Sequence, residues 1–213
     1  MLTAALTLAL ALSAPAERIP TALHTPEGLT AGGYDHFMGQ LSPDGKSLTF
    51  AGNANSTIEV FVQPLERGAP RVLFDEQADV NQPRISPDGT QLLYISYRQD
   101  EGGDACIFDL KTRKRRCLTR PGTAVLHVFW FPDGRSIGAL TRPRLDADHQ
   151  LRRIPTHGRG GIGELLLERN MSAPTVSPDG RWLVYVPLER PDDHTDAARG
   201  TLMRAMRGLV LHR

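Results

Sequence analysis

The hydrophobic residues of this chain gather in short runs that recur along its length. Four runs, at residues 47–50, 91–94, 136–139 and 182–185, are mostly apolar and partly β-branched or aromatic. A polar segment precedes each run, and one apolar residue precedes each polar segment, at Leu41, Ile85, Trp130 and Val176. This pattern predicts short buried β-strands joined by tight turns.

The polar segments are copies of one tetrapeptide, which starts at residues 42, 86, 131 and 177. A repeat of about 40–50 residues has the length of one four-stranded propeller blade. The sequence therefore predicts an all-β fold, a β-propeller of four-stranded antiparallel blades. The four copies are Ser42-Pro43-Asp44-Gly45, Ser86-Pro87-Asp88-Gly89, Phe131-Pro132-Asp133-Gly134 and Ser177-Pro178-Asp179-Gly180.

Turn chemistry accounts for every residue of this tetrapeptide. Proline presets φ for the second position of a reverse turn, aspartate bonds its own backbone, and glycine adopts the left-handed conformation that follows. A catalytic or metal-binding role for Asp44, Asp88, Asp133 and Asp179 is the alternative. Since the turn alone explains them, we interpret these aspartates as structural.

The repeat also sets the expected domain boundaries. We expect blades at residues 36–77, 78–122 and 123–169, a partial blade at 170–190, and an atypical tail at 191–213. The tail lacks a third-strand pattern, and the helical spacing of Leu202, Met206 and Leu209 favours a short helix or an irregular end. The expected strands are 36–41, 47–52, 59–63, 71–74, 81–85, 91–97, 105–110, 115–119, 125–130, 136–141, 150–154, 163–167, 172–176 and 181–187.

About three and a half blades are thus present, as an incomplete ring or as part of a six- to eight-bladed propeller. A propeller normally closes its ring of blades, which removes exposed edges. The chain could be the leading part of a longer protein, a truncated or frame-shifted product, or one that closes with another chain. We favour the first two explanations.

The amino terminus has the features of an export signal. Residues 2–12 are uncharged and mostly apolar, and Ala14-Pro15-Ala16 offers small residues for cleavage. We therefore predict a signal peptide at 1–16, a polar lead-in at 17–35, and a periplasmic or secreted location. An apolar amino-terminal strand or helix is the alternative. The run is too short to span a bilayer.

The two cysteines flank a predicted hairpin. If Lys111-Thr112 forms a two-residue tip, Cys106 lies directly opposite Cys117, where side chains of a non-hydrogen-bonded pair can bridge. We predict a disulfide, conditional on export to an oxidising compartment. Two free thiols are the alternative. A metal site is poorly supported, because no histidine lies nearby at ligand spacing.

Composition and motifs argue against several functions. Lys+Arg 25 against Asp+Glu 24 gives a formal net charge of +1, which disfavours a dedicated nucleic-acid binder. No G-x-S-x-G elbow is present, and we can name no catalytic set. The glycines of residues 158–163 match G-x-G-x-x-G but fall between expected strands, so we interpret them as a hairpin loop. No cofactor is predicted.

Two further features carry open alternatives. Five of the six residues 111–116 are basic, which is typical of a solvated hairpin tip but could also contact an anionic partner. His36 and His127 share strand parity on the first strands of two blades and could approach a central channel. We interpret them as ordinary strand residues, because the matching positions of the other blades offer poor metal ligands.

The repeats resemble the WD40-like repeats of TolB-type propellers. The likeness rests on Pro-x-apolar-Ser-Pro-Asp-Gly at 83–89 and 174–180 and on the strand that follows, and it covers about residues 36–190. It implies a periplasmic six-bladed propeller with a role in protein contacts. Related blades also precede the catalytic domains of prolyl oligopeptidase-type peptidases. We transfer no binding residues, because the matching motif is structural.

These observations lead to two hypotheses about function. The first is an exported, non-enzymatic propeller that acts as a protein–protein interaction scaffold in the cell envelope, with recognition in the rim loops. The second is the amino-terminal propeller of a larger exported hydrolase whose catalytic domain is absent here, or a truncated product. The expected partner is an envelope protein rather than nucleic acid or membrane.

Overall fold

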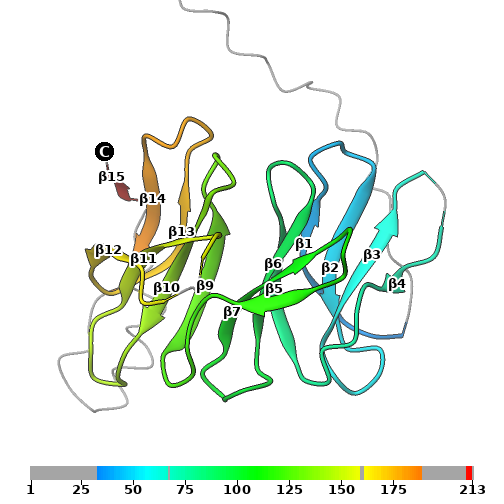
Figure 1. The fold of residues 1–213 in the computed structure, drawn as a ribbon, viewed down its shortest axis with the longest axis horizontal. Coiled ribbons are helices and arrows are strands. Elements are labelled where there is room, and N and C mark those ends of the chain that lie inside the picture. Colours follow the sequence, from blue (N-terminus) through cyan, green and yellow to red (C-terminus); the bar gives the residue numbers. More distant parts are fainter. Residues whose placement is uncertain (1–32, 67, 159–160, 189–209, 213) are drawn as a thin grey trace, which may run out of the picture.

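The computed structural model describes residues 33–66, 68–158, 161–188 and 210–212 of the 213-residue chain. In these residues every regular element is a β-strand, and the strands form four antiparallel sheets that lie side by side in an arc (Figure 1). The arc stays open, with the first and fourth sheets at its ends. The predicted all-β fold, an incomplete propeller of antiparallel blades, is confirmed. The predicted signal peptide lies outside the described residues.

Each sheet is one blade, and its strands follow one another in chain order. The described part of the fourth blade has three strands, and the other blades have four. The bounds are β1 His36–Leu41, β2 Ser47–Gly52, β3 Glu59–Pro64, β4 Arg71–Val72, β5 Val80–Ile85, β6 Gln91–Ser96, β7 Asp104–Asp109, β8 Arg115–Cys117, β9 Ala124–Trp130, β10 Ser136–Arg142, β11 Gln150–Pro155, β12 Glu164–Glu168, β13 Met171–Val176, β14 Leu183–Pro187 and β15 Val210–His212.

The tail differs from the sequence prediction where it is described. Residues 210–212 form β15, which pairs antiparallel with β14 through Tyr185 and Val210. The expectation of a short helix or an irregular end is therefore wrong at these three residues, which supply a third strand to the fourth blade. The rest of the predicted tail, residues 191–209 and Arg213, lies outside the described residues.

The four tetrapeptide turns join the first and second strands of their blades and lie along the upper edge of Figure 1. In the first blade, the amide of Gly45 donates to the carbonyl of Ser42 at 2.9 Å. The hydroxyl of Ser42 donates to Asp44 and accepts from the amide of Ser47 at 3.0 Å. The same bonds recur around Ser86 and Ser177. These serine hydroxyls lower the pKa of Asp44, Asp88 and Asp179.

The third blade closes the same turn without a serine. Phe131 takes that position, and its side chain is buried against the fourth blade. Asp133 instead accepts from Arg153 at 3.0 Å, and the guanidinium of Arg153 lies 4.4 Å from the centroid of the Phe131 ring. The backbone bond from Gly134 to the carbonyl of Phe131 is kept, at 3.0 Å. In the third blade, Arg153 of strand β11 thus replaces the serine hydroxyl as a side-chain donor to the aspartate.

The core is divided among the gaps between neighbouring blades. Leu93, Ile107 and Val128 belong to the cluster between the second and third blades, where each is at most 3% exposed. Similar clusters fill the gap between the first and second blades, around Phe74 and Tyr94, and the gap between the third and fourth blades, around Leu151. Hydrophobic burial is thus continuous along the arc, and each blade depends on its neighbours for it.

Side chains of the first strands also bond across these gaps to backbone. The side-chain amide of Gln82 donates to the carbonyl of Leu126 at 2.9 Å and accepts from the amide of Val128 at 3.1 Å. The amide of Ile85 donates to Gln40 at 2.9 Å. Trp130 Nε1 donates to the carbonyl of Arg84 at 2.9 Å. Together with the apolar clusters, these bonds fix each blade to the next.

Candidate functional site

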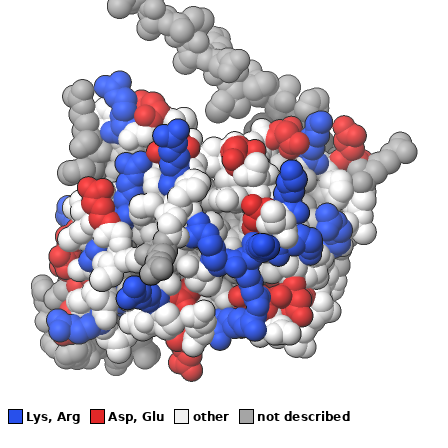
Figure 2. All heavy atoms as spheres, viewed as in Figure 1, with Lys and Arg blue, Asp and Glu red and all other residues white. Residues whose placement is uncertain are grey.

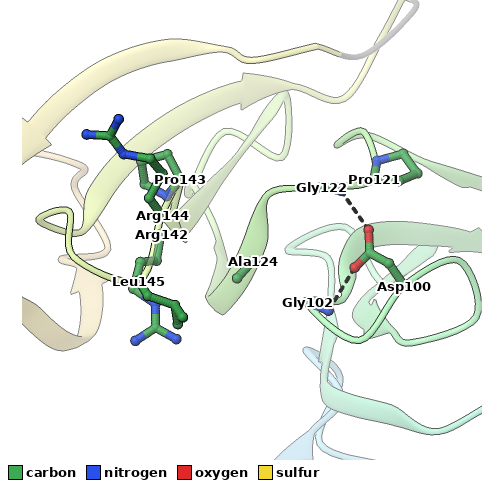
Figure 3. A pocket seen from close by; sticks show the side chains of 9 residues that line it. All are labelled: Asp100, Gly102, Pro121, Gly122, Ala124, Arg142, Pro143, Arg144 and Leu145. Carbon is green, nitrogen blue, oxygen red and sulfur yellow. Dashed lines mark hydrogen bonds between the residues drawn. The ribbon is translucent and has the colours of Figure 1, made fainter.

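A hollow of about 620 Å³ lies between the second and third blades, at the rim opposite the tetrapeptide turns. Its walls come from the β6–β7 loop, the β8–β9 connection and the start of the β10–β11 loop. Figure 3 shows Ala124, the first residue of β9, between the two facing walls. The lining residues are Asp100, Gly102, Pro121, Gly122, Ala124, Arg142, Pro143, Arg144 and Leu145.

Asp100 stabilises one wall of this hollow, which we call the rim cavity. Its carboxylate accepts from the backbone amides of Gly102 at 2.8 Å and Gly122 at 2.7 Å (Figure 3). It also accepts from the amide of Gly103 at 3.0 Å. The bonds join two loops that are about twenty residues apart in the chain. Because backbone donors surround this carboxylate, it suits a brace better than a general base.

The opposite wall carries an apolar side chain and two cations. Leu145 is 86% exposed, which makes it the most exposed large hydrophobic side chain of the described residues. Arg144 forms an ion pair with Asp146 at 3.6 Å, but both side chains are largely in water. Arg142 ends β10 next to them. This wall could therefore contact a surface that has both apolar and acidic groups.

A second hollow, of about 200 Å³, lies beside the first and shares Pro143 with it. The amide of Gly161 donates to the carbonyl of Leu118 at 2.9 Å and holds the β11–β12 loop against the second blade. Ile162, the next residue, is 72% exposed. The two hollows extend one uneven surface along the junction of the second and third blades.

The first strands of the first three blades carry three basic side chains, His36, Arg84 and His127. Burial, together with the nearby positive charge of Arg84, lowers the pKa of His127 to about 4. Burial also lowers the pKa of Arg84, whose guanidinium donates to the carbonyl of Pro83 at 3.2 Å. The ring of His36 packs 5.0 Å from that of Phe50, away from His127 on another blade.

The second blade contains the expected disulfide, Cys106–Cys117. The residues face each other across β7 and β8, as the predicted register requires. The tip differs from the prediction, because residues 110–113 form a four-residue turn in which the amide of Arg113 (φ 57°) donates to the carbonyl of Asp109 at 2.8 Å. The predicted two-residue tip and the observed four-residue turn are both centred between Lys111 and Thr112, so Cys106 still pairs with Cys117.

A buried carboxylate lies close to this hairpin. Glu76 is 5% exposed and accepts from Arg115 at 2.6 Å, from Tyr94 at 3.1 Å and from Ser96 at 2.7 Å. The connection between the first two blades supplies the glutamate, and the edge strand β8 supplies the arginine. Burial raises the pKa of the Tyr94 hydroxyl, and the negative charge of Glu76 raises it further. This network stabilises the hairpin on the body of the propeller.

In residues 33–66, 68–158 and 161–188, no three His, Cys, Asp or Glu side chains come together in a way that could hold a metal ion. The tetrapeptide aspartates lie at one rim, and the cavity lies at the other. No helix in the described part of the chain is long and apolar enough to cross a membrane.

Sequence reasoning overlooked the residues that shape the rim. Asp100 precedes two glycines, which is a turn signal, but nothing in its neighbourhood indicates a bond to Gly122. Leu145 follows a Pro-Arg pair in a loop that the strand pattern leaves blank. A strongly apolar residue in a polar loop is the one signal that could have drawn attention to it.

Comparison with known structures defines the class of protein as a β-propeller, here with an open ring. More particularly, the fold is that of a TolB-like propeller. TolB from Acinetobacter baumannii gives a TM-score of 0.61 at 20% identity over 75% of this chain and 39% of that one. The putative TolB from Agrobacterium tumefaciens gives 0.64 at 23% identity over 80% and 62%. This chain thus spans less than two thirds of either.

Propellers of peptidases are also similar. A puromycin-hydrolyzing peptidase of Mycobacterium tuberculosis gives a TM-score of 0.57 at 15% identity over 72% of this chain and 28% of that one. No protein-family model and no curated protein sequence matches the chain. At these identities the likeness establishes the fold and leaves the function to be argued from the site.

Proposed function

We propose that this chain is an exported, non-enzymatic propeller segment that binds a protein of the cell envelope. The observation that carries the proposal is the rim cavity between the second and third blades. Asp100 fixes one wall, and Leu145, Arg142 and Arg144 present apolar and cationic groups on the other. Arginine is enriched in protein contact surfaces, and a partner would remove the exposed apolar side chain of Leu145 from water.

The rigid frame supports this reading, because recognition loops work best on a scaffold that does not move. Two of the loops of the cavity begin on the buried strands β6 and β10. Loops held in this way lose little conformational entropy when a partner binds. The likeness to TolB propellers and the apolar amino-terminal segment are consistent with an envelope location.

Site-specific photocrosslinking in the native cells tests the proposal. A photoreactive residue in place of Leu145 should crosslink to one discrete protein, because Leu145 lies at the cavity. The same residue in place of Arg135, which is exposed on the tetrapeptide turn of the third blade, is the control. Equal crosslinking from both positions, or none from Leu145 in folded protein, would overturn the rim assignment.

The propeller of a larger exported hydrolase is the second candidate, and the likeness to peptidase propellers favours it. The intact mass of the native protein, measured without reducing agent, distinguishes the two. A mass for residues 17–213 less two hydrogens supports export, signal cleavage and the disulfide together. A much larger mass with a catalytic domain after Arg213 supports the hydrolase.

A further inference from the structure

The outer edge of the second blade is an unpaired strand with an unusual concentration of positive charge. β8 is the last strand of its sheet, and no described residue pairs with its outer side. Its first two residues, Arg115 and Arg116, end the run of residues 111–116, five of which are basic and all of which are exposed. Figure 2 shows Lys and Arg gathered over the middle of the face on which this hairpin lies.

The register of the hairpin shows which backbone groups of β8 point outward. The amide of Asp109 donates to the carbonyl of Lys114 at 2.8 Å, and the amide of Leu118 donates to that of Ala105 at 2.7 Å. Antiparallel pairing alternates, so Arg116 also bonds toward β7, while Arg115 and Cys117 direct their amides and carbonyls to the outside. An extended segment could bond to these groups as a fifth strand.

The side chains of this edge divide between its two faces. Arg115 lies on the face that packs toward the first blade, where Glu76 already binds it. Arg113 is also held, because it donates to the carbonyl of Leu73 at 2.9 Å. Lys114 and Arg116 have the opposite parity and are exposed. These two cations would lie beside alternate side chains of an added strand.

The edge is rigid before any partner arrives. The Cys106–Cys117 bond joins β8 to β7, and the ion pair of Arg115 with Glu76 joins it to the body. Little order has to be gained on binding, which favours affinity. Charged edge strands also occur simply because charge prevents edge-to-edge aggregation. Here the strand that carries Lys114 and Arg116 is itself held in place by the disulfide and by the ion pair of Arg115, so the two cations occupy defined positions along the edge.

We propose that β8 binds an extended, acidic segment of a partner protein, which adds to the second blade as an edge strand. Backbone pairing with Arg115 and Cys117 supplies the alignment, and Lys114 and Arg116 select acidic side chains at alternate positions. The inference rests on the proposed function as a protein-binding scaffold, but it concerns a surface distinct from the rim cavity.

Fluorescence anisotropy with a labelled peptide tests this at low ionic strength. The probe is a short peptide in which glutamate alternates with valine, and it should bind the oxidised full chain. The double variant K114E/R116E should weaken binding by about tenfold, since two exposed charge pairs become repulsive. The control R135E/R181E makes the same charge change on the tetrapeptide turns of the third and fourth blades, away from β8, and should leave binding unchanged. Equal melting temperatures verify that both variants fold.

Two further probes separate strand addition from simple charge attraction. The same peptide with alternate backbone amides methylated keeps its charge but cannot pair as a strand, so it should bind much more weakly. Equal affinity for both peptides would overturn the proposal. Binding of the chain to phosphatidylglycerol vesicles but not to the peptide would also overturn it. A third contrary outcome is that K114E/R116E aggregates while the unchanged chain binds no peptide, because the charges would then serve only to prevent aggregation.

The outcome is independent of the rim experiment. Crosslinking from Leu145 without peptide binding would leave the scaffold function in place and refute the β8 edge. Peptide binding without crosslinking from Leu145 would support β8 and move the partner surface away from the rim cavity.

Discussion

The first and second blades have the same turn but very different surroundings. β6 and β7 of the second blade are buried over nearly their whole length, whereas β1 exposes Met38 by 45% and Leu41 by 52% at the open end of the arc. The tetrapeptide bonds are nonetheless alike in both. The turn is thus a local structure, while burial comes from neighbouring blades, and variants can separate the two contributions.

The sharpest contrast should come from glycines that face different neighbours. A Cβ atom at Gly138 in β10 would lie 2.1 Å from Phe129 Cζ, whereas at Gly39 in β1 the nearest atom is Leu48 Cδ1 at 3.5 Å. Gly138→Val should cost about 3 kcal/mol or more through overpacking. Gly39→Val should cost much less. Chemical denaturation measures both, and similar losses would contradict the contrast.

The buried ion pair should contribute more than an exposed one. Glu76→Gln removes the charge that Arg115, Tyr94 and Ser96 share, and we expect a loss of about 3 kcal/mol in the free energy of unfolding. Asp146→Asn breaks the exposed pair with Arg144 and should leave stability unchanged within error. The comparison fails if thermal unfolding shows the same shift for both.

The disulfide should add stability specifically to the second blade. Replacing both Cys106 and Cys117 by serine releases a closed loop with a sequence separation of 11. The expected loss is about 2–3 kcal/mol. Hydrogen exchange should show the loss concentrated in β7 and β8. Uniform loss across the first and second blades would instead indicate one cooperative unit.

The turn glycines should behave alike in both blades, because their contribution is local. Gly45 has φ 68° and Gly89 has φ 73°, and nothing lies within 4 Å of a Cβ atom at either. Replacement by valine should cost about 1–2 kcal/mol at each through backbone strain alone. Lys114→Ala, on the exposed hairpin, is the control and should have no effect. A loss at Gly89 far above that at Gly45 would show that packing contributes.

The smallest expected effect is a pH dependence from the third blade. The pKa of His127 is about 4 in the folded protein and 6.5 when unperturbed, so between these values only the unfolded chain binds the proton. Stability should fall by about 1 kcal/mol as the pH drops from 6.5 to 4, allowing for partial exposure of the ring. His127→Gln should lack this part of the acid slope. An unchanged slope would place His127 in water.

What could be predicted from the sequence is what depends on near neighbours. The tetrapeptide sets its turn from its own atoms, so β1, β2 and most other strands lie within a residue or two of their expected positions. The pairing of Cys106 with Cys117 follows from the centre of one hairpin. Repetition strengthened these inferences, because four copies of one local signal agree.

What could not be predicted depends on which blades touch. Glu76 and Arg115 are 39 residues apart, and Gln82 and Leu126 are 44 apart, so no local pattern connects them. The rim cavity belongs to the same class, since its two walls come from different blades. In the tail, the sequence shows no third-strand pattern, yet residues 210–212 form a strand because they pair with β14.

The bonds between the inner strands are directed at backbone rather than at side chains. Gln82, Gln40 and Trp130 each reach a carbonyl or an amide of the adjoining blade. Every residue type offers a backbone carbonyl, and every type except proline offers an amide N–H, so these bonds depend on the position of the neighbouring backbone and hardly on its side chains. Adjoining blades are therefore free to diverge in sequence, to be duplicated or to be exchanged by recombination. Each needs only one polar side chain on its first strand that is long enough to reach the backbone of the next blade.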